Sequence, residues 1–238
     1  GPAVSRVMIG RRLLLGLAVS LATYAAPSAA QFVPREAMIP AEQAARQLAP
    51  DRAAPTSAEQ DQIATLESQV GIDRACNTTW QPALEAPRRA LLQLYERTYG
   101  PNHPATARPL LSLLCHFAYN GKTSEGRAEN EQIIARLVAI GRKRAQPATL
   151  FAALTAQAGL RREQAKPDVA IADATEALAL ARRHFADYPA IVASSAGALA
   201  ATFEAAGRPV DAEPLRQEAV TLIQTMPDVA AFGEKDYQ

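Results

Sequence analysis

Two stretches of this chain resemble each other, and their similarity constrains the fold more than any single residue does. Each holds an apolar run, a proline-containing turn, a second apolar run and then a phenylalanine followed four residues later by a glycine. The stretches span residues 89–121 and 176–207, with the pairs Phe117/Gly121 and Phe203/Gly207. Self-similarity at this scale is typical of stacked helical hairpins, in which each unit buries its apolar face against the next.

Apolar residues recur at spacings of three and four through most of the chain, which predicts helices. The ranges are 57–69, 82–99, 104–119, 123–144, 148–165, 168–185, 190–205 and 210–224. The runs 104–119 and 190–205 are apolar almost all round, so they are expected to be inner helices with neighbours on several sides. The predicted fold is all-α: an α-α superhelix of stacked antiparallel helical hairpins, with about seven or eight helices.

The turn GPNHP at 100–104 and the apolar run after it resemble the 42-residue tetratricopeptide repeats of the kinesin-light-chain type. Residues 207–219 are similar to the second half of that repeat, and residues 167–178 resemble the outer helix of an ordinary tetratricopeptide repeat. The resemblance covers about residues 85–225 and implies repeats of one inner and one outer helix. The residues that define the repeats are His103, Pro104, Gly121, Pro189 and Gly207.

The chain departs from this family in two places. The family pattern has one turn between the inner and outer helices of the middle repeat, but two separate turn signals, Gly159 and Pro167, occur there. Their separation predicts a stretched middle repeat whose inner helix runs on past Gly159. The resemblance also implies an asparagine pair that clamps a bound peptide, but Leu111-Ser112 and Gly197-Ala198 occupy those positions. We therefore expect a more apolar partner, a helix, or self-packing instead of an extended peptide.

The N-terminus carries Arg6, Arg11 and Arg12, an apolar run at 13–26 and the small residues Pro-Ser-Ala-Ala at 27–30. This order predicts a Sec-type signal peptide over 1–30, cleaved after Ala30. Met8 is the expected true start, and residues 1–7 are either a cloning remnant or an upstream remnant. Retention as an anchor is the alternative, although the run is shorter than the roughly 20 residues that span a bilayer. Since the Ala- and Arg-rich composition is typical of bacteria, the expected location is periplasmic or secreted.

The remaining chain divides into three parts by composition. Residues 31–56 contain four prolines, which predicts an extended arm with one short helix near 41–48. Residues 57–226 form the repeat domain, and 227–238 form a flexible tail. The signal holds three of the 25 basic residues and none of the 24 acidic ones, so the rest carries a net charge of −2. That balance gives no electrostatic case for nucleic-acid binding.

An exported chain with two cysteines is a candidate for one disulfide, here Cys76–Cys115. The alternative is a buried free thiol at Cys115. Two cysteines and three scattered histidines do not indicate a metal site, and no cofactor motif is present. His103 is expected to fix its turn and not to catalyse, and the carboxylates of 125–131 and 168–176 are expected to lie on solvated faces.

The sequence therefore predicts a non-enzymatic scaffold that binds another protein, or associates with itself, at the cell envelope. The polar or aromatic residues best placed to reach a groove are Arg108, Ser112, Tyr119, Thr155, Gln157 and Thr202. The alternative function is an all-helical enzyme or small-ligand-binding protein that uses the groove of the superhelix.

Overall fold

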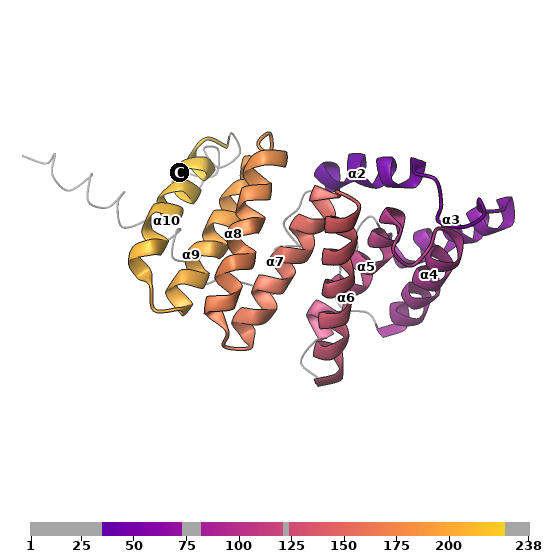
Figure 1. Cartoon of the computed structure of the whole chain (residues 1–238), viewed down its shortest axis with the longest axis horizontal. Coiled ribbons are helices and arrows are strands. Elements are labelled where there is room, and N and C mark those ends of the chain that lie inside the picture. The colour runs from indigo at the N-terminus through magenta and orange to yellow at the C-terminus, as the bar shows by residue number, and fades with distance from the viewer. Residues whose placement is uncertain (1–34, 73–81, 121–123, 227–238) are drawn as a thin grey trace, which may run out of the picture.

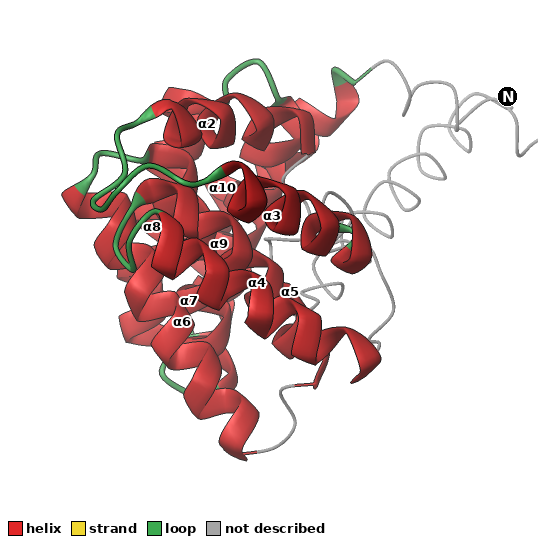
Figure 2. Cartoon of the chain, turned by 90° about the vertical axis from the view of Figure 1, so that its right-hand side faces the viewer, coloured by secondary structure: helices red, strands yellow, loops and turns green. Residues whose placement is uncertain are grey.

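The structure is a computed structural model that describes residues 35–72, 82–120 and 124–226. The predicted signal peptide, Cys76, Gly121 and the tail lie outside these residues. The described part consists of helices and connecting loops with no strand, as Figure 2 shows, so the all-α prediction is confirmed. Its α-helices are α2 Arg35–Gln47, α3 Ser57–Val70, α4 Glu85–Thr98, α5 Ala107–Asn120, α6 Ser124–Lys143, α7 Pro147–Glu163, α8 Pro167–His184, α9 Pro189–Ala205 and α10 Pro209–Gln224. This count of nine slightly exceeds the seven or eight expected.

From α3 onward, the helices stack in chain order. Each packs against the next, and α7 also contacts α9 (Figure 1). Three hairpins follow one another, α5/α6, α7/α8 and α9/α10. Their outer helices begin at Ser124, Pro167 and Pro209, intervals of 43 and 42 residues. The short 3₁₀ helix η4 (Pro104–Thr106) opens the first hairpin. The chain is therefore an α-α superhelical array with an inner layer (α5, α7, α9) and an outer layer (α4, α6, α8, α10).

Three turns of the array share one backbone conformation. Each contains a residue with positive φ: Ala145 at 50°, Ala165 at 56° and Gly207 at 71°. The N–H of the residue that follows donates to the carbonyl five residues back, at 2.9, 2.9 and 2.8 Å, and a proline opens the next helix. This bond satisfies a carbonyl that the helix end would leave unpaired. The turn conformation thus sets where α7, α8 and α10 begin.

These turns correct the expectation of a stretched middle repeat. Helix α7 does run past Gly159, as expected, but it ends at Glu163 and has 17 residues, the same length as α9. Ala165, and not Gly159, occupies the position of Gly207. The sequence pattern was misleading because a glycine is the usual left-handed residue and here an alanine takes the role.

The core lies between the two layers. Helix α7 contributes much of this core, with nine buried residues from Ala148 to Ala158. Small side chains let the helices approach closely: a Cβ added at Gly141 of α6 would lie 2.8 Å from the Cβ of Leu150 on α7. The abundant alanine and this glycine therefore suit the sequence to close helix packing.

Helix α2 corrects the expected extended arm over 31–56. It begins earlier and is longer than the short helix near 41–48, and it continues through Pro40. Pro40 is exposed, so its missing N–H costs one hydrogen bond on the solvent side. Ala37, Met38 and Ala45 on the opposite side are buried against the array, and this packing outweighs the proline. None of the described helices is long and apolar enough to cross a membrane.

Candidate functional site

Two of the predicted groove residues satisfy their hydrogen bonds within their own helices. The hydroxyl of Thr155 on α7 donates to the carbonyl of Phe151 at 2.8 Å, and that of Thr202 on α9 donates to the carbonyl of Ala198 at 2.7 Å. Both threonines are buried. Such back-bonding uses the only donor of the side chain, so neither residue presents its hydroxyl proton to a groove.

Gln157 ties α7 to the outer helix α8. Its amide donates to Asp173 Oδ1 at 3.0 Å, and the guanidinium of Arg161 pairs with Asp173 Oδ2. Asp173 is only 8% exposed. Burial raises its pKa above the ordinary range, while Arg161 and Gln157 act in the opposite direction. The carboxylate thus joins two layers of the array, in contrast to the solvated face expected for it.

Ser112 lies in a buried polar contact between α4 and α5. Its carbonyl accepts from Nη1 of Arg88 at 2.9 Å, and its own hydroxyl is buried with no hydrogen-bond partner. Arg88 is 2% exposed, and burial lowers the pKa of its guanidinium. The sequence analysis did not single out Arg88, and its position beside the charged run of α4 gave no signal of burial. The side chain of Tyr119 lies outside the described residues.

Arg108 is the predicted groove residue that lies in a multi-helix site. Its Nη1 is 3.3 Å from Oε1 of Glu67 on α3, and its Nε is 3.4 Å from Oε2 of Glu42 on α2. Glu67 Oε1 also accepts from the Tyr95 hydroxyl at 2.6 Å and from Nη2 of Arg46 at 2.9 Å. We call these five residues, which join α2, α3, α4 and α5, the α2 network.

The α2 network balances two arginines against two glutamates. The paired side chains of Arg108, Glu42 and Glu67 are only 12–15% exposed. Burial, and then the Glu67 carboxylate, raise the pKa of the Tyr95 phenol, which keeps it protonated as a donor. Since the positive charges meet carboxylates and the phenol keeps its proton, the arrangement is suited to holding helices together.

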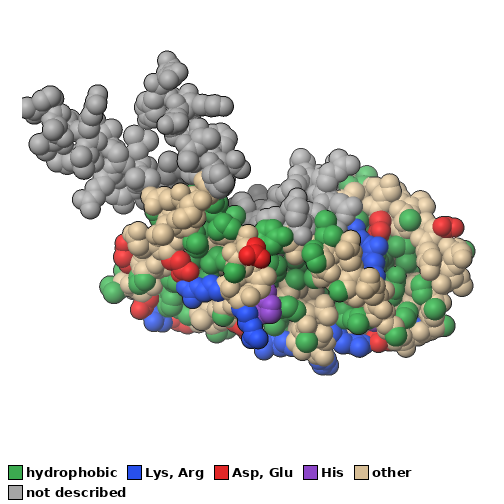
Figure 3. All heavy atoms as spheres, turned by 90° about the horizontal axis from the view of Figure 1, so that it is seen from above, with side chains coloured by type: hydrophobic (Ala, Val, Ile, Leu, Met, Phe, Trp, Pro, Cys, Tyr) green, Lys and Arg blue, Asp and Glu red, His purple; other side chains and the backbone are tan. Residues whose placement is uncertain are grey.

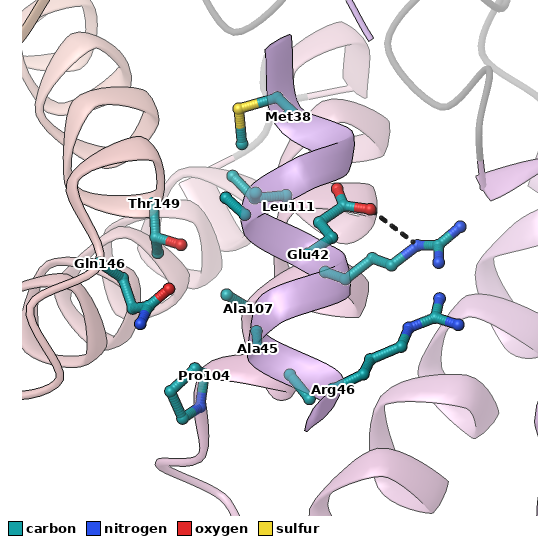
Figure 4. A pocket seen from close by; sticks show the side chains of 12 residues that line it. Met38, Glu42, Ala45, Arg46, Pro104, Ala107, Leu111, Gln146 and Thr149 are labelled. Atoms are coloured by element: carbon teal, nitrogen blue, oxygen red, sulfur yellow. Dashed lines mark ion pairs between the residues drawn. The ribbon is translucent and has the colours of Figure 1, made fainter. Parts of the chain in front are cut away.

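A narrow hollow lies beside this network, between α2 and the inner helices. Figure 4 shows Met38, Glu42 and Ala45 of α2 facing Leu111 of α5 and Thr149 of α7, and a dashed line marks the Glu42–Arg108 ion pair. The hollow has room for on the order of one water molecule. Pockets for small organic ligands are commonly about 300–1,000 Å³, so α2 fills this part of the inner layer almost completely.

His103 holds the predicted turn in place. The residue is fully buried; Nδ1 accepts from the Ala105 N–H at 3.2 Å, so Nε2 carries the proton that faces the Ala49 carbonyl at 3.1 Å. The Tyr99 ring stacks on the imidazole, with the two ring centroids 5.4 Å apart. Burial lowers the pKa of His103, which agrees with a structural and neutral histidine.

The remaining repeat-defining residues lie at element boundaries. Pro104 is buried at the start of η4, Pro189 opens α9 and Gly207 adopts its positive φ. Cys115 is 2% exposed on α5. Because Cys76 lies outside the described residues, the Cys76–Cys115 disulfide stays a prediction.

Sequence reasoning missed a ladder of ion pairs along the outer layer, which joins each outer helix to the next. The pairs are Arg89–Glu129, Arg136–Glu96, Arg142–Glu176 and Arg182–Glu218. The signal was present as Arg and Glu separated by 34 to 40 residues, about one repeat. On the face seen in Figure 3, side chains of both signs are interspersed with apolar ones.

Within the described residues, no group of three or more His, Cys, Asp or Glu side chains is arranged to hold a metal ion. Comparison of the chain with protein-family models, with curated proteins and with solved structures found no match.

Proposed function

We propose that this chain is an exported tetratricopeptide-type scaffold of the bacterial envelope that binds another protein and carries out no reaction of its own. The observation that supports this most is the regular stack of three hairpins at intervals of 42 or 43 residues. Repeat arrays of this kind expose long, continuous surfaces to partners.

The use of the polar side chains supports the same proposal. Arg108, Gln157 and Asp173 are engaged between helices, and the hollow beside α2 is too small for an organic substrate. Catalysis requires groups that are free to meet a substrate in a defined cavity. Arg108, Gln157 and Asp173 instead make contacts that hold the helices of the array together.

Site-specific photo-cross-linking in living bacteria tests the proposal. A photoreactive residue is placed at exposed Ala190 on inner helix α9 or, as the matched control, at exposed Ala172 on outer helix α8. The full chain is expressed with its own N-terminus, and cross-linked species are identified by mass spectrometry. We expect an envelope protein to be captured from Ala190 and not from Ala172. Capture of nothing from either position, or a chain that stays in the cytoplasm, would contradict the proposal.

A further inference from the structure

Helix α2 is the one described α-helix that does not continue the stack. In Figure 1 it runs crosswise over the array, and it lines the hollow together with residues of α5 and α7. It contacts η4 at the start of the first hairpin. Removal of α2 would uncover a surface on the inner layer while α3–α10 stay in their mutual contacts. We call this surface, formed by Pro104, Ala107, Arg108, Leu111, Gln146 and Thr149, the α2 surface.

The side of α2 that meets this surface has a simple chemical pattern. Small or flexible apolar residues, Met38, Ala41 and Ala45, recur at spacings of three and four. Glu42 lies between them and pairs with Arg108, and Arg46 one turn later pairs with Glu67. The α2 surface therefore recognises an amphipathic helix with small apolar residues, an acidic residue and a basic residue four positions further on.

Helix α2 buries little apolar surface against the array. Of its three buried apolar residues, two are alanines, and Leu48 just after it is 45% exposed. Its polar attachment consists largely of the Glu42–Arg108 and Arg46–Glu67 ion pairs, and a charged partner of a largely buried pair is costly to leave without its opposite charge. Detachment of α2 would expose Ala37, Met38 and the part of the core cluster that they contact, so the surface requires another helix to cover it once α2 has left.

The chain just after α2 is fixed independently. The Ala49 carbonyl meets His103, the Asp51 N–H donates to the Tyr99 carbonyl at 2.9 Å, and the Asp51 carboxylate accepts from Arg144 Nη2 at 2.6 Å. The anchor lies within four residues of the end of α2. The helix can therefore detach by a change of backbone angles near Leu48 while 49–72 stay in place.

We propose that the α2 surface binds an amphipathic helix of a partner protein, and that α2 is the intramolecular occupant which this helix displaces. The partner helix carries small apolar residues at three-four spacing, an acidic residue that meets Arg108 and a basic residue that meets Glu67. This inference rests on the proposed scaffold function and specifies the chemistry of the partner at one site.

The test uses the full chain with Glu42→Arg, which places a positive charge against Arg108 and leaves α3–α10 unchanged. The matched control is Glu176→Arg, which makes the same charge reversal in the Arg142–Glu176 ion pair of the outer layer, away from α2. The probe is a fluorescent synthetic peptide of residues 35–47, REAMIPAEQAARQ, and binding is followed by anisotropy. Hydrogen exchange of the amides of α2 reports whether the helix has left.

We expect amide exchange in α2 to be at least about tenfold faster in the Glu42→Arg chain, as one lost charge pair implies. The peptide should bind that chain at least about tenfold more tightly than it binds the wild-type or Glu176→Arg chain. A peptide that itself carries Glu42→Arg should not bind the Glu42→Arg chain, but should bind a chain with Arg108→Glu. If the Arg108→Glu chain does not fold, the inference is still tested by comparing how the wild-type peptide and the Glu42→Arg peptide bind to the Glu42→Arg chain.

Equal binding of the peptide to all chains, or no binding to a chain whose α2 has detached, would overturn the inference. So would a concentration-dependent dimer of the Glu42→Arg chain, because it would assign the surface to a second copy of this protein. Peptide binding with no protein captured in living cells would leave the α2 surface standing and refute the envelope partner. Capture of a partner without peptide binding would refute only the α2 surface.

Discussion

The left-handed turn at Ala165 allows a test of the hairpin geometry. Exchanging its alanine with a nearby glycine leaves the amino-acid composition of the protein unchanged. Ala165 has a φ of 56° and an exposed side chain, so replacing it with glycine removes strain and uncovers no core. A left-handed L-residue costs roughly 1–2 kcal/mol, and the added freedom of the unfolded chain returns about 0.4–1 kcal/mol of that. Ala165→Gly should therefore stabilise the protein by about 0.5–1 kcal/mol.

Gly159, six residues earlier, is the matched site for the opposite exchange. It lies inside α7, where an added Cβ meets no atom within 4 Å. Gly159→Ala should stabilise by about 1 kcal/mol, because glycine is a poor helix former. The double variant has the composition of the wild type, so unfolded-state effects largely cancel. The two changes together should contribute about 1.5–2 kcal/mol.

Urea denaturation followed by circular dichroism measures these differences, and thermal melts should shift upward by about 2–4 °C per kcal/mol. Gly207→Ala, with its φ of 71°, should show the reverse sign and lose about 0.5–1 kcal/mol. If Ala165→Gly instead destabilised by the amount expected inside a helix, residue 165 would be helical and the reasoning on the turns would be wrong.

Three further predictions follow from individual contacts. Protonation of His103 Nδ1 would set two N–H donors against each other at Ala105, and the pKa of His103 is lowered in the folded protein. The stability that neutral His103 contributes should therefore be present above about pH 6.5 and be lost as pH falls through the folded pKa. In urea titrations at several pH values, His103→Asn should reduce this loss of stability at acid pH. Gly141→Ala should destabilise by about 1–3 kcal/mol through its clash with α7, and a neutral or stabilising result in the same titrations would refute the close packing. A double-mutant cycle on Arg142 and Glu176 should give a coupling of about 0.2–1 kcal/mol that shrinks in 1 M salt; a coupling unchanged by salt would argue against an exposed pair.

The positions of the repeats were predictable because helical periodicity and proline are local signals. The expected inner helix 190–205 and outer helix 210–224 agree within a residue or so with α9 and α10. Helix α2 was not predictable in the same way. Pro40 is a strong local signal against a helix, whereas the burial of Met38 and Ala45 depends on surfaces that come together only in the folded chain.

The groove residues show a second limit. Arg108, Thr155 and Gln157 were chosen because polar side chains on inner helices can face a groove. Periodicity states which side of a helix a residue lies on, but not what lies opposite it. Asp173, 16 residues after Gln157, and Glu42, far earlier in the chain, decide where these side chains are bonded.

The sequence by itself determined that the chain is all-helical, that its hairpins stack and where most helices begin and end, because these features depend on interactions within a few residues. Only the tertiary structure decided that Ala165 takes the left-handed turn, that Arg88 is buried and that α2 covers the inner layer. Each of these depends on the balance between a local cost and burial against distant residues, and that balance exists only once the helices have packed.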